Sequence, residues 1–205
     1  MLDISLSVNR LLKKDSMLQD LFYDPLIENL YPGSNYFQSI VRSIVYQQLS
    51  GKVAKKIHER FINVFNLGIY PYPKDVLNIS KEKLRSVGLS YMKVDYIKNV
   101  ATYFIKNPKV ITTLDQRSDQ EIIELVSSIK GVGVWTVQMF LMFTLNRPDV
   151  FPVTDLALQK GYSAYYKKKK LADPKNMLDH SKEWIPHRTT MSLYLWRYLE
   201  GSFEW

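Results

Sequence analysis

The spacing of apolar residues constrains the fold of this chain more than any other feature of its sequence. Apolar side chains recur every three to four residues, as they do on the buried face of an amphipathic helix. In the segment YFQSIVRSIVYQQLS they occupy positions i, i+3, i+4, i+7 and i+8, namely Phe37, Ile40, Val41, Ile44 and Val45. No segment alternates apolar and polar residues over the length of a strand and then turns through a pair such as Asn-Gly. The sequence therefore predicts an all-α protein.

Several helix starts and ends can be located as well. Ser118 and Glu121 form an S-x-x-E capping box, and apolar residues repeat at helical spacing behind it as far as Gly131. A second apolar helix is expected from residue 134 to about 145, and the last helix from about 189 to 199. These three segments place most of the motifs discussed below on helices or on the turns that join them.

Proline-containing breaks divide the chain into about eight to eleven helices. The breaks are Tyr31-Pro32-Gly33, Tyr70-Pro71-Tyr72-Pro73, Asn107-Pro108, Arg147-Pro148 and Asp173-Pro174. Since there is no low-complexity linker and no repeat, we expect one domain over residues 1–205. In this interpretation residues 36–110 and 111–165 form much of the helical core, and the terminal helices in 1–35 and 166–205 complete a second lobe.

The 205 residues include no cysteine. This excludes disulfide frameworks, zinc fingers, iron–sulfur clusters and thiol nucleophiles. The three scattered histidines offer no metal-ligand cluster either. No apolar run reaches the ~18 residues of a membrane-spanning helix, and no long apolar run follows the first charged residues. We therefore expect a soluble cytoplasmic protein without membrane contact, associated with the nucleoid if the organism is prokaryotic.

Positive charge is concentrated in two segments. The formal net charge is +8, from 28 Lys and Arg against 20 Asp and Glu. Residues 42–60 carry five cationic side chains and one anionic one, and residues 130–170 carry seven and two, which leaves the rest of the chain nearly neutral. Such concentration is typical of a protein that binds a polyanion such as nucleic acid. The run Lys167 to Lys170, taken alone, is equally typical of a solvated loop or helix face.

Two glycines separated by one residue lie in the segment IKGVGVWT, between two predicted helices. They permit a tight turn that leaves backbone N–H groups exposed at the start of the next helix, where a phosphate can bind. This is the helix–hairpin–helix signature, which grips DNA phosphates without reading sequence. The pattern also occurs where a helix simply ends on a glycine. The expected phosphate-binding residues are Lys130, Gly131, Gly133, Val134 and Thr136.

Asp155 follows a proline-containing loop and Thr154 and precedes a helical run. It should therefore lie at a helix N-terminus, where the helix dipole favours an ionised carboxylate. Most aspartates in this position only cap the helix. Twenty residues separate Trp135 from Asp155, and an outgoing helix with a returning loop would fill that interval. This spacing can bring the carboxylate back beside the hairpin, facing DNA.

Together these motifs resemble the helix–hairpin–helix, Gly/Pro-rich loop and aspartate of the HhH-GPD DNA glycosylase superfamily. Within it, the chain most resembles the 3-methyladenine DNA glycosylase II family. The likeness extends from residues 129–161 to the segments SIVRSIVYQQLSGKVAKKI, LRSVGLSYMKVDYIKNVA and WIPHRTTMSLYLW, and so covers most of residues 36–199. It implies a two-lobed helical fold with a DNA-binding cleft between the lobes, and it places Asp155 at the catalytic aspartate of the family.

The resemblance also implies an activity. A monomer would bind damaged double-stranded DNA, flip an alkylated purine such as 3-methyladenine or 7-methylguanine out of the duplex, and excise it in base excision repair. Asp155 would stabilise the positive charge that develops on the sugar and aid water attack. Bifunctional relatives carry a lysine that attacks the sugar at the position of Trp135. A monofunctional glycosylase without lyase activity is therefore implied.

Further residues acquire roles by the same resemblance. Gln48 falls at the wedge that fills the gap in the duplex, although it fits a surface amide equally well. Trp135, His187, Met139 and Gln47 would line the base pocket, where aromatic faces stack on cationic purines. Trp135 and Met139 also fit ordinary core positions at helical spacing. At the position of His187 the family often has a stacking tryptophan, so the range of bases is open.

No cofactor is expected to be required. By resemblance, the backbone carbonyls of Ser127, Ile129 and Val132 could hold a structural Na⁺ or K⁺ ion at the hairpin. Two other functions remain open at this point. The chain could be a non-enzymatic DNA-binding module that uses only the hairpin, or a glycosylase for another base such as hypoxanthine or uracil.

Overall fold

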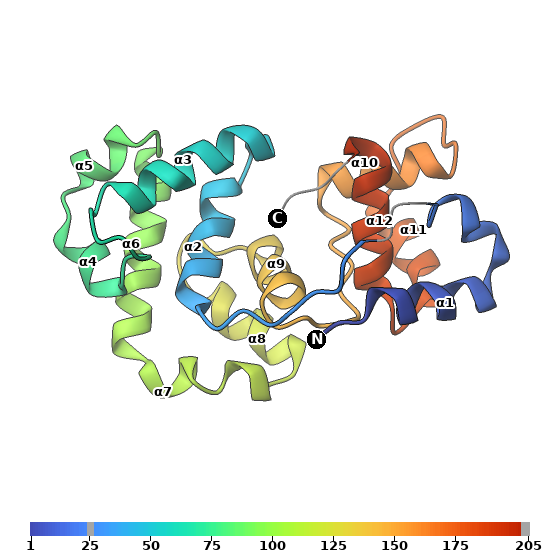
Figure 1. Ribbon diagram of the computed structural model, residues 1–205, viewed down its shortest axis with the longest axis horizontal. Helices are drawn as coiled ribbons and strands as arrows, with labels where there is room; N and C mark the ends of the chain where they lie inside the picture. Colours follow the sequence, from blue (N-terminus) through green and yellow to red (C-terminus); the bar gives the residue numbers. More distant parts are fainter. Residues whose placement is uncertain (24–26, 202–205) are drawn as a thin grey trace. The chain divides into compact units, whose positions relative to one another are not determined.

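The computed structural model of the chain describes residues 1–23 and 27–201 (Figure 1). Within these residues it has twelve α-helices, three short 3₁₀-helices and no β-strand, apart from one isolated bridge between Leu2 and Leu30. The all-α prediction is confirmed. None of the helices in the described part of the chain is both long and apolar enough to span a membrane.

The number of α-helices exceeds the eight to eleven expected from the proline breaks. Four of the twelve are only four to seven residues long, too short to produce a recognisable apolar repeat. They are α4 (Pro73–Asn78), α5 (Lys81–Ser86), α7 (Pro108–Ile111) and α11 (Pro174–His180). The 3₁₀-helices are η1 (Ser16–Asp20), η2 (Leu114–Gln116) and η3 (Ser181–Trp184).

The chain forms two compact units. The central unit comprises residues 33–140, and the terminal unit comprises residues 1–32 together with 141–205. The boundary at residue 140 lies inside α9 (Val134–Phe143), so the segment 111–165 is divided between the two units. Residues 24–26 and 202–205 of the predicted terminal segments lie outside the described residues.

In the central unit, α2 (Tyr36–Tyr46) packs against α3 (Gly51–Asn63) and α6 (Tyr91–Lys106). The five apolar residues predicted to share one face of this helix are all buried, none with more than 4% of its surface exposed. The predicted capping box opens α8 (Asp119–Ser127), because Ser118 and Glu121 each accept the backbone N–H of the other. Both local predictions are confirmed.

In the terminal unit, α10 (Leu156–Tyr165) and α12 (Arg188–Glu200) lie side by side, orange and red in Figure 1, and α1 (Ile4–Lys14) also contacts α12. The two helices approach most closely at Gly161. A Cβ atom added there would lie 2.2 Å from the carbonyl oxygen of Leu195. Of the three apolar residues predicted on one side of the last helix, Leu193 and Trp196 are buried, whereas Leu199 is 37% exposed at its end.

Candidate functional site

The hairpin between α8 and α9 depends on Gly131. Its φ of +101° lies in a region that L side chains rarely adopt. A Cβ atom there would lie 2.0 Å from Cγ of Tyr96 on α6, so the ring of Tyr96 occupies the space that any side chain would need. Nearby, the side-chain amide of Asn99 donates to the carbonyl of Lys130 over 3.0 Å and ties the hairpin to α6.

Gly133 is the N-cap of α9. Its carbonyl accepts the N–H of Val137 over 3.2 Å, so the N–H groups of residues 134–136 belong to the first turn, where the helix itself supplies no acceptor. A Cβ atom at Gly133 would meet nothing within 4 Å, and Val134 is 49% exposed. The start of α9 is therefore open at the surface, the geometry in which backbone N–H groups bind a phosphate.

Thr136 contributes differently from what the sequence suggested. Its side chain is 1% exposed, and its hydroxyl accepts a hydrogen bond from Nε2 of Gln47 over 2.9 Å. A phosphate at the hairpin could therefore use the backbone N–H of Thr136 but not its hydroxyl. The structure thus brings together Thr136, which was predicted to bind phosphate, and Gln47, which was predicted to line the base pocket.

Gln48, the predicted wedge, lies on an exposed turn between α2 and α3 with a φ of +56°. The preceding residue, Gln47, is the C-cap of α2, and its carbonyl accepts a hydrogen bond from Nζ of Lys93 over 2.7 Å. The same ammonium group also binds the carbonyl of Val45 over 2.8 Å. Partial burial lowers the pKa of Lys93. Lys93 on α6 and Thr136 on α9 therefore hold the turn from two sides.

The other predicted pocket residues of the central unit lie on α9. Trp135 is partly exposed in the first turn, two residues after Gly133. Met139 is only 1% exposed, which fits a residue that fills the core. The position of Trp135 near the open helix start is compatible with its predicted role in the base pocket.

Asp155 is the N-cap of α10, as the sequence predicted. Its Oδ1 atom accepts the backbone N–H of Leu158 over 2.7 Å. The indole N–H of Trp196 on α12 donates to the same oxygen over 2.9 Å. The carboxylate is thus fixed by its own helix and by a buried side chain of a second helix.

His187, the remaining predicted pocket residue, occupies the N-cap position of α12 and is 6% exposed. Its Nδ1 atom is buried and has no hydrogen-bond partner among the described residues. Burial, together with the positive charges of Arg10 and Lys14, lowers the pKa of this imidazole, while Asp149 opposes the shift. A lowered pKa favours the neutral imidazole, which would suit the predicted role of His187 beside a positively charged base.

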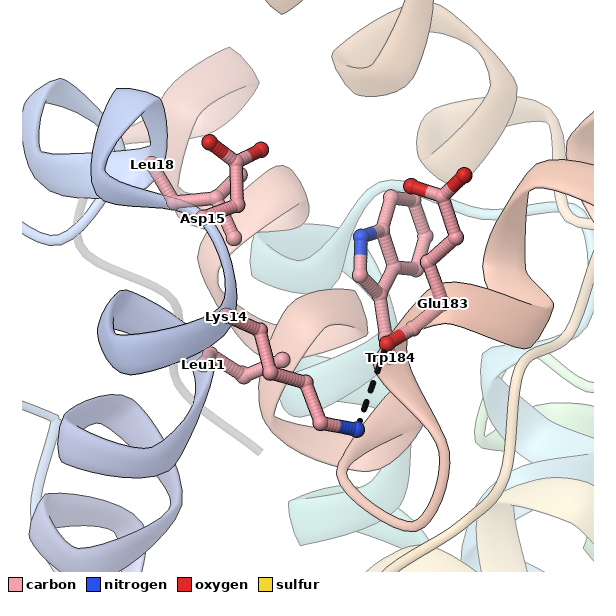
Figure 2. Close-up of a pocket in the computed structure, with 6 residues that line it drawn as sticks. All are labelled: Leu11, Lys14, Asp15, Leu18, Glu183 and Trp184. Carbon is pink, nitrogen blue, oxygen red and sulfur yellow. Dashed lines mark hydrogen bonds between the residues drawn. The ribbon is translucent and has the colours of Figure 1, made fainter.

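A pocket of about 320 Å³ lies next to the loop that precedes His187. Figure 2 shows Lys14 extending toward this loop beside Trp184 and Glu183. Its Nζ atom donates to the carbonyls of Glu183 over 3.4 Å and Ile185 over 2.7 Å. Lys14 thereby links α1 to the loop that leads into α12.

The carbonyls predicted to hold a cation lie at the end of α8 and in the hairpin. The oxygen of Ile129 accepts the N–H of Val132 over 2.9 Å, which leaves its second lone pair for another partner. Ser127 is the last residue of α8. A cation here would be held by backbone oxygens, since the described residues contain no group of three or more acidic or histidine side chains that could bind a metal. This site stays a prediction.

The basic segment 130–170 is not one continuous surface. Lys167 to Lys170 follow the C-terminal end of α10, whereas Asp155 caps its N-terminal end. Ten helical residues span about 15 Å. All four lysines are exposed, and within the described part of the chain none of them forms an ion pair. The interpretation of this run as a solvated loop fits the structure better than a direct role beside Asp155.

Residues 41–187 match the sequence profile of the HhH-GPD superfamily of base excision DNA repair proteins. The chain belongs to this superfamily. Two curated HhH-GPD relatives illustrate the likeness. DNA-3-methyladenine glycosylase 1 of Schizosaccharomyces pombe is 35% identical over an alignment of 164 residues that covers 78% of this chain and 71% of that protein. Putative DNA-3-methyladenine glycosylase YfjP of Bacillus subtilis is 31% identical over an alignment of 169 residues that covers 80% of this chain and 59% of that protein.

Solved HhH-GPD structures agree with the fold. The S. pombe 3-methyladenine DNA glycosylase in complex with abasic DNA superimposes with a TM-score of 0.81 at 30% identity, covering 97% of this chain and 94% of that one. DNA-3-methyladenine glycosidase of Bacillus halodurans gives a TM-score of 0.78 at 34% identity, covering 95% and 89%. The fold of this HhH-GPD protein is therefore shared over nearly its whole length.

Two residues that contact the predicted site residues Gln47 and Asp155 were not predicted from the sequence. Lys93 binds carbonyls that lie more than 45 residues earlier in the chain, and no local pattern marks it. For Trp196 a signal existed. A tryptophan on the buried side of a helix still carries an N–H group, which usually finds an acceptor, so its position on the apolar face already implied a buried partner.

Proposed function

We propose that this chain is a DNA glycosylase that flips alkylated purines, of the 3-methyladenine and 7-methylguanine type, out of double-stranded DNA and hydrolyses their N-glycosidic bonds. One observation carries the proposal: a chain of the base excision repair superfamily holds Asp155 rigidly at the start of α10. The names of the relatives, 3-methyladenine DNA glycosylases at 30% to 35% identity, support the substrate class.

DNA binding would begin at the hairpin. The open first turn of α9 offers backbone N–H groups to a phosphate, a contact that positions the duplex without reading its sequence. Flipping a base out of the stack costs a few kcal/mol, and least for a damaged pair. Gln48 would fill the vacated space from its exposed turn, which Lys93 and Thr136 hold in place through Gln47.

The chemical step needs little from the protein. When the bond between C1′ and the purine nitrogen breaks, its electron pair leaves with the base and neutralises the positive charge that alkylation had placed there. The sugar is left with an oxocarbenium-like charge, which the carboxylate of Asp155 stabilises electrostatically. Water then adds at C1′ and loses a proton, so the products are the free purine and an abasic site. Since an alkylated purine is already a good leaving group, no general acid is required.

The subclass is part of the proposal. Trp135 has no amine, so the hairpin helix supplies no nucleophile for a Schiff base at this position. The enzyme would then be monofunctional, of the 3-methyladenine DNA glycosylase II type, and would leave the abasic strand intact. Borohydride should trap no covalent complex between the protein and DNA, and a trapped complex would refute the monofunctional assignment. We further propose that it acts as a monomer in the cytoplasm or nucleoid, with any hairpin cation serving only structure.

The test is release of 3-methyladenine and 7-methylguanine from methylated duplex DNA by the protein and by Asp155→Asn. Asparagine keeps a side-chain oxygen for the helix cap but removes the charge, so release should fall by roughly 10² to 10³-fold. Unchanged release would contradict the role of Asp155. If the unaltered protein binds duplex DNA yet releases no base, the non-enzymatic binding module is correct. A panel of oligonucleotides with hypoxanthine or uracil decides whether another base is preferred.

A further inference from the structure

We infer that Trp196 is a positioning residue for Asp155: its indole N–H fixes the carboxylate in the orientation that stabilises the transition state. This inference rests on the proposed glycosylase activity, because it gives Trp196 a role in that reaction. Trp196 lies 41 residues beyond Asp155, on α12, and it is 3% exposed.

The geometry distinguishes Asp155 from an ordinary helix cap. A capping aspartate is held by one backbone N–H, here that of Leu158, and its carboxylate can still exchange one oxygen for the other. In this chain a second donor, Nε1 of Trp196, reaches the same Oδ1 atom from another helix. Hydrogen bonds to an ionised acceptor are shorter and stronger than neutral ones. Two of them converging on one oxygen oppose rotation of the carboxylate.

The donor is itself held in place. The ring of Trp196 stacks on Phe143, with centroids 6.3 Å apart and ring planes 23° from parallel. One residue before Trp196, the carbonyl oxygen of Leu195 lies 2.2 Å from where a Cβ atom of Gly161 would be, so the backbones of α10 and α12 are too close for any residue but glycine at this position. This close approach brings a side chain of α12 within hydrogen-bonding distance of the residue that caps α10.

A fixed carboxylate matters because electrostatic catalysis depends on groups that are already oriented when charge develops. A carboxylate that must reorient during the reaction would lose part of that effect. The N–H of Trp196 should therefore influence the rate of bond cleavage rather than the binding of DNA, which depends on the hairpin.

The experiment compares Trp196→Phe with the unaltered protein in single-turnover release of 7-methylguanine from methylated duplex DNA. Phenylalanine keeps a ring in the core but lacks the donor. Release should slow by about 10- to 100-fold, as expected for loss of a hydrogen bond to a charged group. The dissociation constant for a duplex containing a non-cleavable abasic analogue should not change. Tyr194→Phe is the matched control, because Tyr194 is fully buried on the same helix and its hydroxyl accepts the backbone N–H of Ile27 over 3.3 Å. It should leave the release rate unchanged.

A double-mutant cycle separates positioning from general support of the fold. In the Asp155→Asn background, adding Trp196→Phe should cause little further slowing, since the charge that Trp196 orients is already absent. An equal fold-loss in both backgrounds would overturn the inference. Should Trp196→Phe fail to fold, benzothienylalanine at position 196 keeps the shape of the indole and replaces only the N–H, and full activity with it would also overturn the inference. If the unaltered protein releases no base, the proposed function fails instead.

Discussion

The helices α9 and α10 begin in opposite ways, although each start is preceded by a short loop and each was marked in the sequence. At α9 the N-cap is Gly133, which has no side chain, and the first turn is open at the surface. At α10 the N-cap is Asp155, whose carboxylate accepts the N–H of Leu158. Both ends carry the same partial positive charge of a helix N-terminus.

The difference shows that the partial positive charge of a helix N-terminus can attract either an external anion or an acidic side chain of the protein itself. Without a capping side chain, the start of α9 can take its negative charge from outside, as a DNA phosphate. At α10 the protein provides the acidic group itself, the side chain of Asp155, which is the proposed catalytic residue. The identity of the N-cap residue thus distinguishes the helix start proposed to bind DNA from the one proposed to act in catalysis.

The largest effect should come from changing the cap of α10. Asp155→Ser keeps a good capping oxygen, whereas Asp155→Ala removes both the charge and the cap. Base release should fall by roughly 10² to 10³-fold in each, because neither supplies a carboxylate. Thermal denaturation should show a loss of about 1 kcal/mol in unfolding free energy only for the alanine variant. If serine retained activity, capping rather than charge would be the function of Asp155, and the contrast with α9 would disappear.

The hairpin glycines give the next largest effect. Gly131→Ala places a Cβ atom within the ring of Tyr96 at an unfavourable φ, so the free energy of unfolding should fall by about 2 kcal/mol or more. Gly133→Ala should leave stability within about 0.5 kcal/mol, since open space surrounds that position.

Duplex binding distinguishes the second glycine from the first. The methyl group of Gly133→Ala would occupy the place of a phosphate, so affinity for duplex DNA should fall about tenfold, the effect of losing one hydrogen bond to a charged group. Unchanged affinity in this stable variant would mean that the start of α9 does not contact DNA. The two variants therefore test folding and binding separately.

The smallest effect is expected at a third helix start, that of α8. There the hydroxyl and the N–H of Ser118 both donate to the Glu121 carboxylate, and these bonds lower its pKa below the usual 4.5. Because the folded-state pKa is the lower one, the stabilisation is present above pH 4.5 and is lost as the pH falls through the folded pKa. Glu121→Gln should show a smaller drop in Tm between pH 6 and pH 3 than the unaltered protein. An identical drop would mean that this helix start does not depend on its charge.

Local features of the fold were predictable from the sequence. The buried face of α2, the capping box of α8 and the cap of α10 each depend on residues within one or two helical turns, and all are confirmed. The short helices α4, α7 and α11 were not predicted individually, because a helix of one or two turns is too short for periodicity to define.

The candidate site was predictable in part. The sequence did not reveal hydrogen bonds between residues far apart in the chain, or which way a side chain faces. Asp155 and the two glycines were found from their neighbours in sequence. The bonds of Trp196 and Lys93 join residues 41 to 48 positions apart, which a linear pattern does not encode. The apolar sequence of α9 gave no indication that the Thr136 hydroxyl faces inward. The net charge of residues 130–170 likewise does not show that α10 separates Asp155 from the lysine run.

Gln48 illustrates a trade-off between stability and function. Its φ of +56° would suit glycine, and a side chain in this conformation costs about 1 kcal/mol or more. Gln48→Gly should therefore make the protein more resistant to heat while removing the side chain proposed to enter the duplex. Selection for thermal stability alone would therefore favour Gln48→Gly, although this variant should lose base-release activity. A screen for stabilised variants should include an activity measurement from the first round.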